Sequence, residues 1–401
     1  MKKNRVRYYT DPVHGIISFP WELLQLVIDH PYLQRLRRIT QCGLSHFVFP
    51  GANHTRFHHT LGVAHIAWRV IQVMQEKGFS ISKDEAEATC LAALLHDIGH
   101  GPYSHALEQK IIPFHHEEIS LAIAQRMNQE LSGALDMAIS ILKKEHPKKF
   151  LSQLIASQLD VDRLDYLTRD SFYTGIEEGR VGIDRLIRTF SVHENKLVTE
   201  EKAIQTVEKF LVARHHMYWQ VYIHKAVLSI QQMLIMLVER IKTNCRNQND
   251  VIMPSSLRSL ITNAENSSVQ NLLDSYLALD DVTIMQVIKD NLGHPDYILS
   301  YLCNCLLDRK IFGLEWISIE KNDYTFAQKL RNINLSLGDQ NDEILFLIRT
   351  GTEKSTSYVL DNEIEILTNH GDIIPLSEAS HVFFKEESLS KSFICYPRHK
   401  R

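Results

Sequence analysis

The chain lacks the features that define several protein classes. Its 44 Lys and Arg residues are balanced by 48 Asp and Glu residues over 401 positions, a net charge of −4, so it has no basic excess typical of nucleic-acid binders. Its six cysteines form no Cys-x-x-Cys pair, which excludes zinc-finger and disulfide scaffolds and is typical of reduced thiols in the cytoplasm. The most apolar run, 226–238, is too short to cross a bilayer. No apolar segment follows the charged residues 1–5, so we expect a cytoplasmic protein without a signal peptide or membrane span.

Histidine, by contrast, is abundant. The chain has 21 histidines, and twelve of them lie within its first 116 residues. Histidine is the commonest metal ligand and the side chain best suited to move protons near neutral pH. The crowding therefore points to chemistry in the first part of the chain.

The spacing of apolar residues predicts a mainly α protein. We expect a helical domain over 1–245 and a C-terminal α+β lobe over 246–401. The helices are expected near 21–29, 31–41, 53–76, 83–95, 103–111, 115–131, 134–145, 148–157, 160–174, 203–245, 254–263, 266–278 and 282–306. Strands are expected at 190–193, 196–199, 311–317, 344–349, 355–360, 363–367 and 392–396.

His96 and Asp97 follow the apolar run 91–95 and need partners, because burying either side chain unpaired is costly. Both can reach one ion only if it lies over the helix end, so other ligands must come from elsewhere, and His59 and Asp162 are the candidates. Imidazoles with carboxylates suit zinc, iron or manganese better than calcium. A hydrogen-bonded pair in the core is the alternative. Three further imidazoles and a carboxylate close to this pair favour a metal site over that alternative; they are His100, His105, His116 and Glu117.

Three segments together resemble a known family. They are Arg56–Val63, His96–His105 and Asp162, which are similar to the H…HD…D metal-dependent phosphohydrolases. Within that superfamily the chain resembles the dNTP triphosphohydrolase (dGTPase-like) branch, which includes the SAM-and-HD-domain dNTPase of vertebrates. The resemblance runs from about Arg7 to Lys225, and includes 11–15 and 48–52. It implies an HD-domain helical core.

The resemblance also implies roles for individual residues. The implied metal ligands are His59, His96, Asp97 and Asp162, holding manganese, iron, zinc or nickel, with additional magnesium on the triphosphate. His105 corresponds to the general acid, and Glu108, three residues on, would orient its imidazole. The implied contacts to the α-phosphate are His100, His116 and Arg56, with Glu117 as a partner of the histidines.

A substrate pocket is predicted from helical spacing. Asp162, Tyr166, Arg169 and Asp170 fall at i, i+4, i+7 and i+8 and would share one helix face. By resemblance Tyr166 packs on the sugar and would exclude a ribose 2′-hydroxyl, while Asp170 and Gln41 bond the 3′-hydroxyl.

Cations for the phosphates are predicted on two helices. By resemblance Arg163 holds the β- and γ-phosphates. A second face with helical spacing would form the phosphate and base wall; it comprises Arg214, Tyr218, Tyr222 and Lys225. An aromatic stripe packed in the core, with its cations reaching outward, is the alternative.

A regulatory site is a further hypothesis. Arg7, Asp29, Gln34 and Arg37 match positions that bind an activating guanine nucleotide in the vertebrate relative. Such a site at a subunit boundary would imply a homo-oligomer, a dimer or a tetramer. A solvated helix with ordinary charges is the alternative.

The leading functional hypothesis is metal-dependent hydrolysis of dNTPs, dGTP included, at the α-phosphorus, which releases deoxynucleoside and intact triphosphate. The alternatives are another HD phosphohydrolase, acting as a nucleotidase or on cyclic nucleotides or guanosine tetraphosphate, and a nucleotide-sensing module with weak single-stranded nucleic-acid binding.

Overall fold

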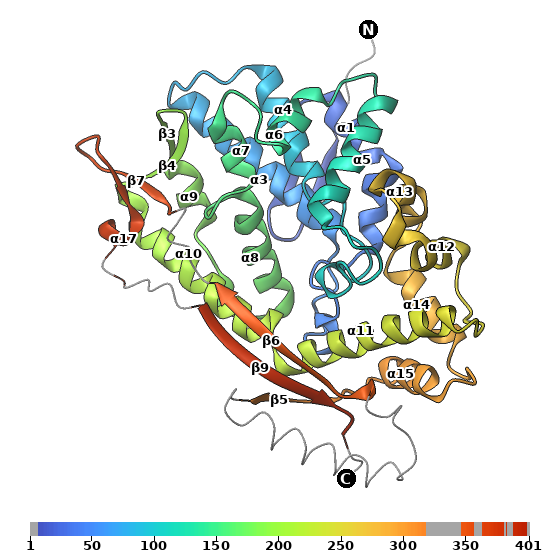
Figure 1. The fold of residues 1–401 in the computed structure, drawn as a ribbon. Helices are drawn as coiled ribbons and strands as arrows, with labels where there is room; N and C mark the ends of the chain where they lie inside the picture. The colour runs from blue at the N-terminus through green and yellow to red at the C-terminus, as the bar shows by residue number, and fades with distance from the viewer. Residues whose placement is uncertain (1–6, 318–345, 357–362, 381, 383–387, 399–401) are drawn as a thin grey trace.

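The computed structural model describes residues 7–317, 346–356, 363–380, 382 and 388–398 (Figure 1). Helices dominate the chain up to residue 307, so the mainly α fold with a C-terminal α+β region is confirmed. The α-helices are α1 Glu22–Asp29, α2 Pro31–Gln34, α3 Arg56–Glu76, α4 Lys83–Leu95, α5 His116–Glu130, α6 Asp136–Leu142, α7 Lys149–Ile155, α8 Val161–Thr174, α9 Ile183–Thr189, α10 Ile204–Met217, α11 Lys225–Arg246, α12 Ser255–Asn263, α13 Val269–Leu277, α14 Asp281–Asp290, α15 Tyr297–Leu307 and α17 Leu376–Ala379.

Three small sheets accompany the helices. An antiparallel hairpin joins β1 Tyr8–Asp11 to β2 Gly15–Ser18. A four-stranded sheet has the order β3 Phe190–His193, β4 Lys196–Glu200, β7 Glu365–Leu367 and β8 Ile373–Pro375. A three-stranded sheet has the order β5 Gly313–Ile317, β9 Ser388–Tyr396 and β6 Arg349–Thr356, and Figure 1 shows it beside α10 and α11.

The core of the helical part forms around α3. This helix packs against α4 and α8, and its side chains are buried along most of its length. Each large apolar side chain buried there contributes about 1.5–3 kcal/mol. Gly62 allows the closest approach, because a Cβ at this position would collide with Asp165 and Arg169 of α8.

Local signals place the motif residues at helix ends. Thr55 and His58 form a capping box at the start of α3. Asp160 caps α8, since its Oδ1 accepts from the backbone N–H of Arg163 at 2.8 Å. The helix α4 ends at Leu95, directly before His96 and Asp97. The His and Asp residues of the motifs are therefore presented where three helices begin or end.

Several predicted helices differ from the structure. The expected helix over 203–245 is wrong, because Tyr218–Tyr222 form a π-helical turn and α10 and α11 meet at a 57° bend. The expected helix over 103–111 is a loop with a single 3-10 turn, since Tyr103 and Ser104 both adopt left-handed backbone conformations.

Other boundaries differ as well. The expected helix over 31–41 is a short α2 followed by a 3-10 turn, Arg35–Arg38, and the one over 282–306 is two helices. Residues 344–345 and 357–360 of two predicted strands lie outside the described residues; the described strand there is β6. The hairpin β1–β2 was not predicted.

Contacts cross the predicted domain boundary at residue 245. Strand β4 pairs in parallel with β7, with Thr199 opposite Ile366. The carboxylate of Asp281 accepts from the backbone N–H groups of Thr40 and Tyr103 at 2.9 and 2.6 Å. The boundary itself stays a prediction.

Among the described residues, no single helix combines the length and apolar character that a membrane crossing needs. The bent pair Glu201–Tyr222 and Lys225–Arg246 meets that requirement only when taken together.

Candidate active site

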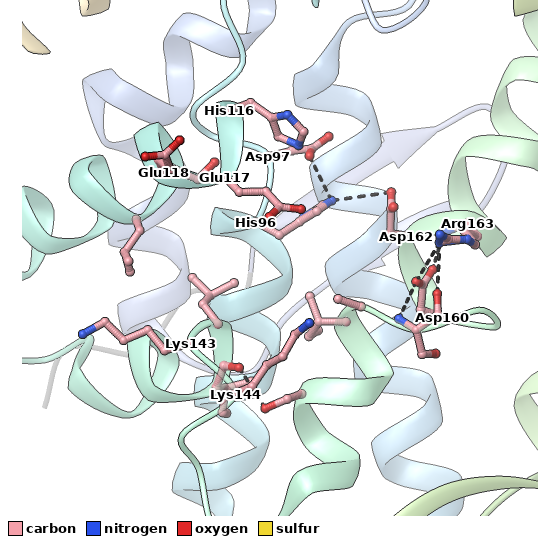
Figure 2. A pocket seen from close by; sticks show the side chains of 18 of the residues that line it. His96, Asp97, His116, Glu117, Glu118, Lys143, Lys144, Asp160, Asp162 and Arg163 are labelled. Atoms are coloured by element: carbon pink, nitrogen blue, oxygen red, sulfur yellow. Dashed lines mark hydrogen bonds and ion pairs between the residues drawn. The ribbon is translucent and has the colours of Figure 1, made fainter. Parts of the chain in front are cut away.

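Four predicted metal ligands lie together where α3, α4 and α8 meet. His59 comes from the first turn of α3, His96 and Asp97 follow α4, and Asp162 comes from the first turn of α8. Asp162 Oδ1 lies 3.0 Å from Nε2 of His59 and 3.5 Å from Nε2 of His96. The Asp97 carboxylate lies 3.6 and 3.5 Å from the same two nitrogens. Figure 2 shows His96, Asp97 and Asp162 pointing toward one another.

This cluster fits a divalent metal ion. The Nε2 atoms of His59 and His96 are buried and form no aligned hydrogen bond within the described part of the chain. Ligand atoms about 2.1 Å from one ion are separated from each other by about 2.9–3.5 Å, close to the distances between these donors. Two imidazole nitrogens and two carboxylates suit zinc, iron, manganese or nickel, and which of these is native stays a prediction.

The carboxylates of the cluster are held in the ionised form that a metal requires. Burial of Asp97 opposes its charge, but His96, Arg56 and His100 outweigh burial and keep the pKa of this carboxyl well below its ordinary value. Burial also opposes charge on Asp162, and His59 and His96 outweigh it and lower the pKa of Asp162. Both side chains are thus negatively charged at neutral pH.

A buried polar network lies behind His59. Asp165 Oδ2 lies 2.8 Å from His59 Nδ1, and Asp165 Oδ1 lies 2.6 Å from His14 Nε2. Arg169 donates to both oxygens of Asp165 at 2.9 Å and to Asp11 at 2.7 Å. If His59 Nδ1–H donates to Asp165, the lone pair of Nε2 faces the cluster, which is the tautomer that metal binding needs.

A second group of imidazoles lies beside the first. Glu108 contacts Nδ1 of His105 at 2.8 Å and Nδ1 of His116 at 2.6 Å, so both histidines are held by one carboxylate. The rings of His100 and His116 stack with their centroids 3.9 Å apart and their planes 15° apart. Ligand atoms of His100, His105 and His116 lie within 4.8 Å of one another, which is close enough for one ion, and imidazoles grouped in this way also suit protons and anions.

A cavity of about 670 Å³ opens beside these groups. It is lined by ligands of the first cluster, by His116 and Glu117, and by Arg163 and Arg214 (Figure 2). Two guanidinium nitrogens at this cavity, Arg163 Nε and Arg214 Nη1, are buried without a hydrogen-bond partner in the described residues. The predicted phosphate contact Arg56 is instead paired with Asp97 and donates to Ser104 Oγ at 2.7 Å.

The residues predicted to contact the sugar lie in a separate buried group. Tyr222 donates to Asp170 at 2.7 Å, and His54 Nε2 lies 2.7 Å from the other oxygen of Asp170. The ring of Tyr166 lies 6.3 Å from that of Tyr222. Gln41 Oε1 is buried and has no hydrogen-bond partner among the residues described.

Only some residues of the two predicted substrate-binding helix faces lie at the main cavity. Tyr218 donates to the backbone oxygen of Lys354 at 2.7 Å, and Lys225 lines a different cavity together with Trp219 and Trp316. Lys225 lies beyond the π-helical turn and the break before α11, which change its angular spacing from Arg214. The N–H of Tyr218 still bonds to the oxygen of Arg214, as in a regular helix, but neither Tyr218 nor Lys225 is among the described residues that line the main cavity. Arg169 also turns away, toward Asp165.

The four residues predicted to bind an activating nucleotide form a local polar cluster. Arg7 pairs with Asp29, and Arg37 donates to Gln34 at 2.7 Å. The guanidinium of Arg37 also lies 3.7 Å from the centre of the Phe57 ring. Their role in regulation, like the homo-oligomer, stays a prediction.

Comparison with known proteins agrees with this arrangement. Residues 56–170 match the HD domain, and residues 181–294 match an HD-associated region. A solved structure of a phosphohydrolase from Bacteroides thetaiotaomicron is 39% identical, covers 98% of this chain and 100% of its own, and superposes with a TM-score of 0.93. The chain belongs to the HD-domain phosphohydrolases.

Other relatives of this HD phosphohydrolase differ in the share of the chain over which they are similar to it. The uncharacterized protein YwfO of Bacillus subtilis is 31% identical over 97% of this chain and 90% of its own length. The deoxynucleoside triphosphate triphosphohydrolase SAMHD1 of Bos taurus is 30% identical over 58% of this chain. This chain covers 47% of that protein, about half its length.

Some residues of the HD site were not predicted from the sequence. Asp165 and its partner His14 were given no role, nor were His54 and Cys42, whose Sγ lies 3.7 Å from His54 Nε2. The spacing of Asp165 and Arg169 at i and i+4 was a usable signal for a buried ion pair. The link from Asp165 to His59 joins residues 106 positions apart, and no local pattern reveals it.

Replacing Asp165 by Asn should weaken metal binding. The amide keeps the shape but places no negative charge behind His59, so we expect metal affinity to fall about tenfold to a hundredfold. The measurement is metal content by mass spectrometry after dialysis against graded free-metal concentrations. Asp162→Ala, which removes a ligand, should lose the ion altogether. Unchanged affinity in Asp165→Asn would show that the network is only structural.

Acid should destabilise the protein through His65 of α3. Burial, together with the nearby His14, whose ring centroid lies 5.6 Å away, lowers the pKa of His65 from 6.5 to about 4. Between these pH values the unfolded chain binds a proton that the folded protein does not, so the free energy of unfolding falls as pH decreases. In metal-free protein, His65→Leu should reduce the loss between pH 7 and pH 5 by about 1–2 kcal/mol, measured by urea denaturation. His370→Leu, at an exposed position, is the control and should match the wild type; equal pH dependence in all three proteins would contradict the assignment.

Proposed function

We propose that this HD phosphohydrolase hydrolyses deoxynucleoside triphosphates, dGTP included, at the α-phosphorus and releases deoxynucleoside and inorganic triphosphate. The observation that carries the proposal is a single cavity lined both by the His-Asp cluster and by two arginines with unpartnered buried N–H groups. The similarity to SAMHD1, named a deoxynucleoside triphosphate triphosphohydrolase, spans this region and supports the choice of substrate.

The electrostatics of the cavity favour a polyphosphate. Arg163 pairs with Asp160 at 3.2 Å, whereas Arg214 has no carboxylate partner among the described residues. Burial lowers the pKa of Arg214, and the nearby Arg163 cation lowers it as well. A phosphate between the two guanidinium groups would satisfy their free donors and relieve their mutual repulsion.

The residues beside the metal cluster supply the remaining chemistry. A bound divalent ion would lower the pKa of water and withdraw charge from a phosphate oxygen. His105 would donate a proton from Nε2 to the departing 5′-oxygen, since its Nδ1 contacts Glu108 at 2.8 Å. His116 shares that carboxylate and, with His100, would bind the α-phosphate oxygens. Arg56, paired with Asp97, positions that ligand.

Selection for deoxyribose would come from the buried group around Tyr166. The unpartnered Gln41 Oε1 can accept a hydrogen bond from a 3′-hydroxyl. Asp170 already accepts from Tyr222, and its other oxygen contacts His54, so its geometry is fixed before substrate binds. A ring packed on the C2′ carbon would leave no room for a ribose 2′-hydroxyl.

Product analysis tests the proposal. Purified protein loaded with Mn²⁺ would be incubated with each dNTP and each NTP, and the products separated by anion-exchange chromatography. We expect intact triphosphate from dNTPs and none from NTPs, and no product from Asp162→Ala. Pyrophosphate or orthophosphate as the first product, or no turnover of any dNTP, would contradict the proposal.

A further inference from the structure

The cavity at the active site continues beyond Arg163 and Arg214. Its far wall comes from α5, from the end of α6 and from α7, and includes Leu121, Leu142 and Ile155. Two adjacent lysines, Lys143 and Lys144, follow α6 at this wall. Figure 2 shows the Lys144 side chain extending into the cavity, whereas Lys143 points away from it.

The backbone at Lys144 is unusual for a lysine. Lys144 has a φ of +61°, in the left-handed region, directly after the last residue that caps α6. The N–H of Lys144 bonds to the oxygen of Ile141 at 3.0 Å, and the N–H of Glu145 bonds to that of Ser140 at 2.9 Å. Glycine is the residue favoured at this position of a helix end, although Ser132, Gln248 and Arg309 adopt the same conformation after α5, α11 and α15.

A capping role alone does not explain this lysine. Lys143 already places a cation at the end of α6, where the helix dipole favours one. Lys144 is exposed and forms no ion pair within the described part of the chain, although Glu117 and Glu118 also line the cavity. A cation that enters a cavity without a carboxylate partner is suited to an anionic ligand.

We propose that Lys144 binds the terminal phosphate of the substrate and so makes the third phosphate a requirement for tight binding. The inference rests on the proposed function. Four cationic side chains are among the described residues that line the cavity: Lys143, Lys144, Arg163 and Arg214. Lys143 points away from the cavity and is not expected to contact the ligand. Arg163 directly follows the predicted ligand Asp162, and Arg214 interacts electrostatically with both, so Lys144 is the cation left to meet the end of the polyphosphate chain.

The test uses Lys144→Gly, with Lys143→Ala as the matched control. Glycine suits the left-handed backbone, so this variant should fold at least as stably as the wild type, which thermal denaturation checks. Isothermal titration calorimetry with inorganic tripolyphosphate and pyrophosphate then measures binding directly. We expect Lys144→Gly to weaken tripolyphosphate binding roughly tenfold to a hundredfold, leaving pyrophosphate binding unchanged. Lys143→Ala should change neither, and Lys144→Arg should restore most of the affinity.

Kinetics give a second, independent reading. With dGTP, Lys144→Gly should raise KM by a similar factor and leave kcat within about twofold, because the contact is made equally in the bound substrate and the transition state. Equal tripolyphosphate affinities in Lys144→Gly, Lys143→Ala and the wild type would overturn the inference. If the wild type does not turn over dGTP but Lys144→Gly still loses tripolyphosphate binding selectively, the proposed function fails while the phosphate site stands.

Discussion

The carboxylate of Asp165 is the constraint on which the rest of the site depends. It is buried between α3 and α8, where it contacts His59 and His14 and accepts from Arg169. Burying such charges is costly, and the cost is offset only because Arg169 neutralises Asp165 and reaches Asp11 as well. The absence of a side chain at Gly62 leaves room for this network. Because Asp165 contacts Nδ1 of His59, the packing of α3 against α8 determines that Nε2 of His59 faces the other predicted metal ligands.

A second carboxylate, that of Glu108, orients histidine rings in the same way as Asp165 does. Glu108 holds the Nδ1 atoms of His105 and His116, as Asp165 does for His59, so in each case a carboxylate leaves Nε2 available. The loop that carries His105 includes two left-handed residues, Tyr103 and Ser104. The N–H of Tyr103 is tied to Asp281 of α14, so the C-terminal part of the chain helps to shape this loop. One side of the site is thus suited to a metal and the other to proton transfer.

The sequence was most informative where a residue's chemistry and its local pattern agree. The His-Asp pair after an apolar run and Asp162 in the first turn of a capped helix were predicted together, and the structure brings both carboxylates within 3.6 Å of Nε2 of His59 and of His96. The prediction of one continuous helix over 203–245 failed, because the π-helical turn and the break before α11 depart from regular helix geometry and change the angular spacing between Arg214 and Lys225. Prediction also missed Asp165 and Lys144, because long-range hydrogen bonds and a left-handed residue after a helix leave no periodic signal.

In the proposed reaction, water attacks the α-phosphorus at the His-Asp cluster while His105 protonates the departing 5′-oxygen. Turnover of dGTP by metal-loaded protein in ¹⁸O-labelled water, followed by mass spectrometry of both products, tests it most directly. We expect one ¹⁸O atom in the inorganic triphosphate and none in the deoxynucleoside. Label in the deoxynucleoside 5′-hydroxyl would mean attack at carbon, and label in orthophosphate or pyrophosphate would mean attack at another phosphorus; either result would contradict the account.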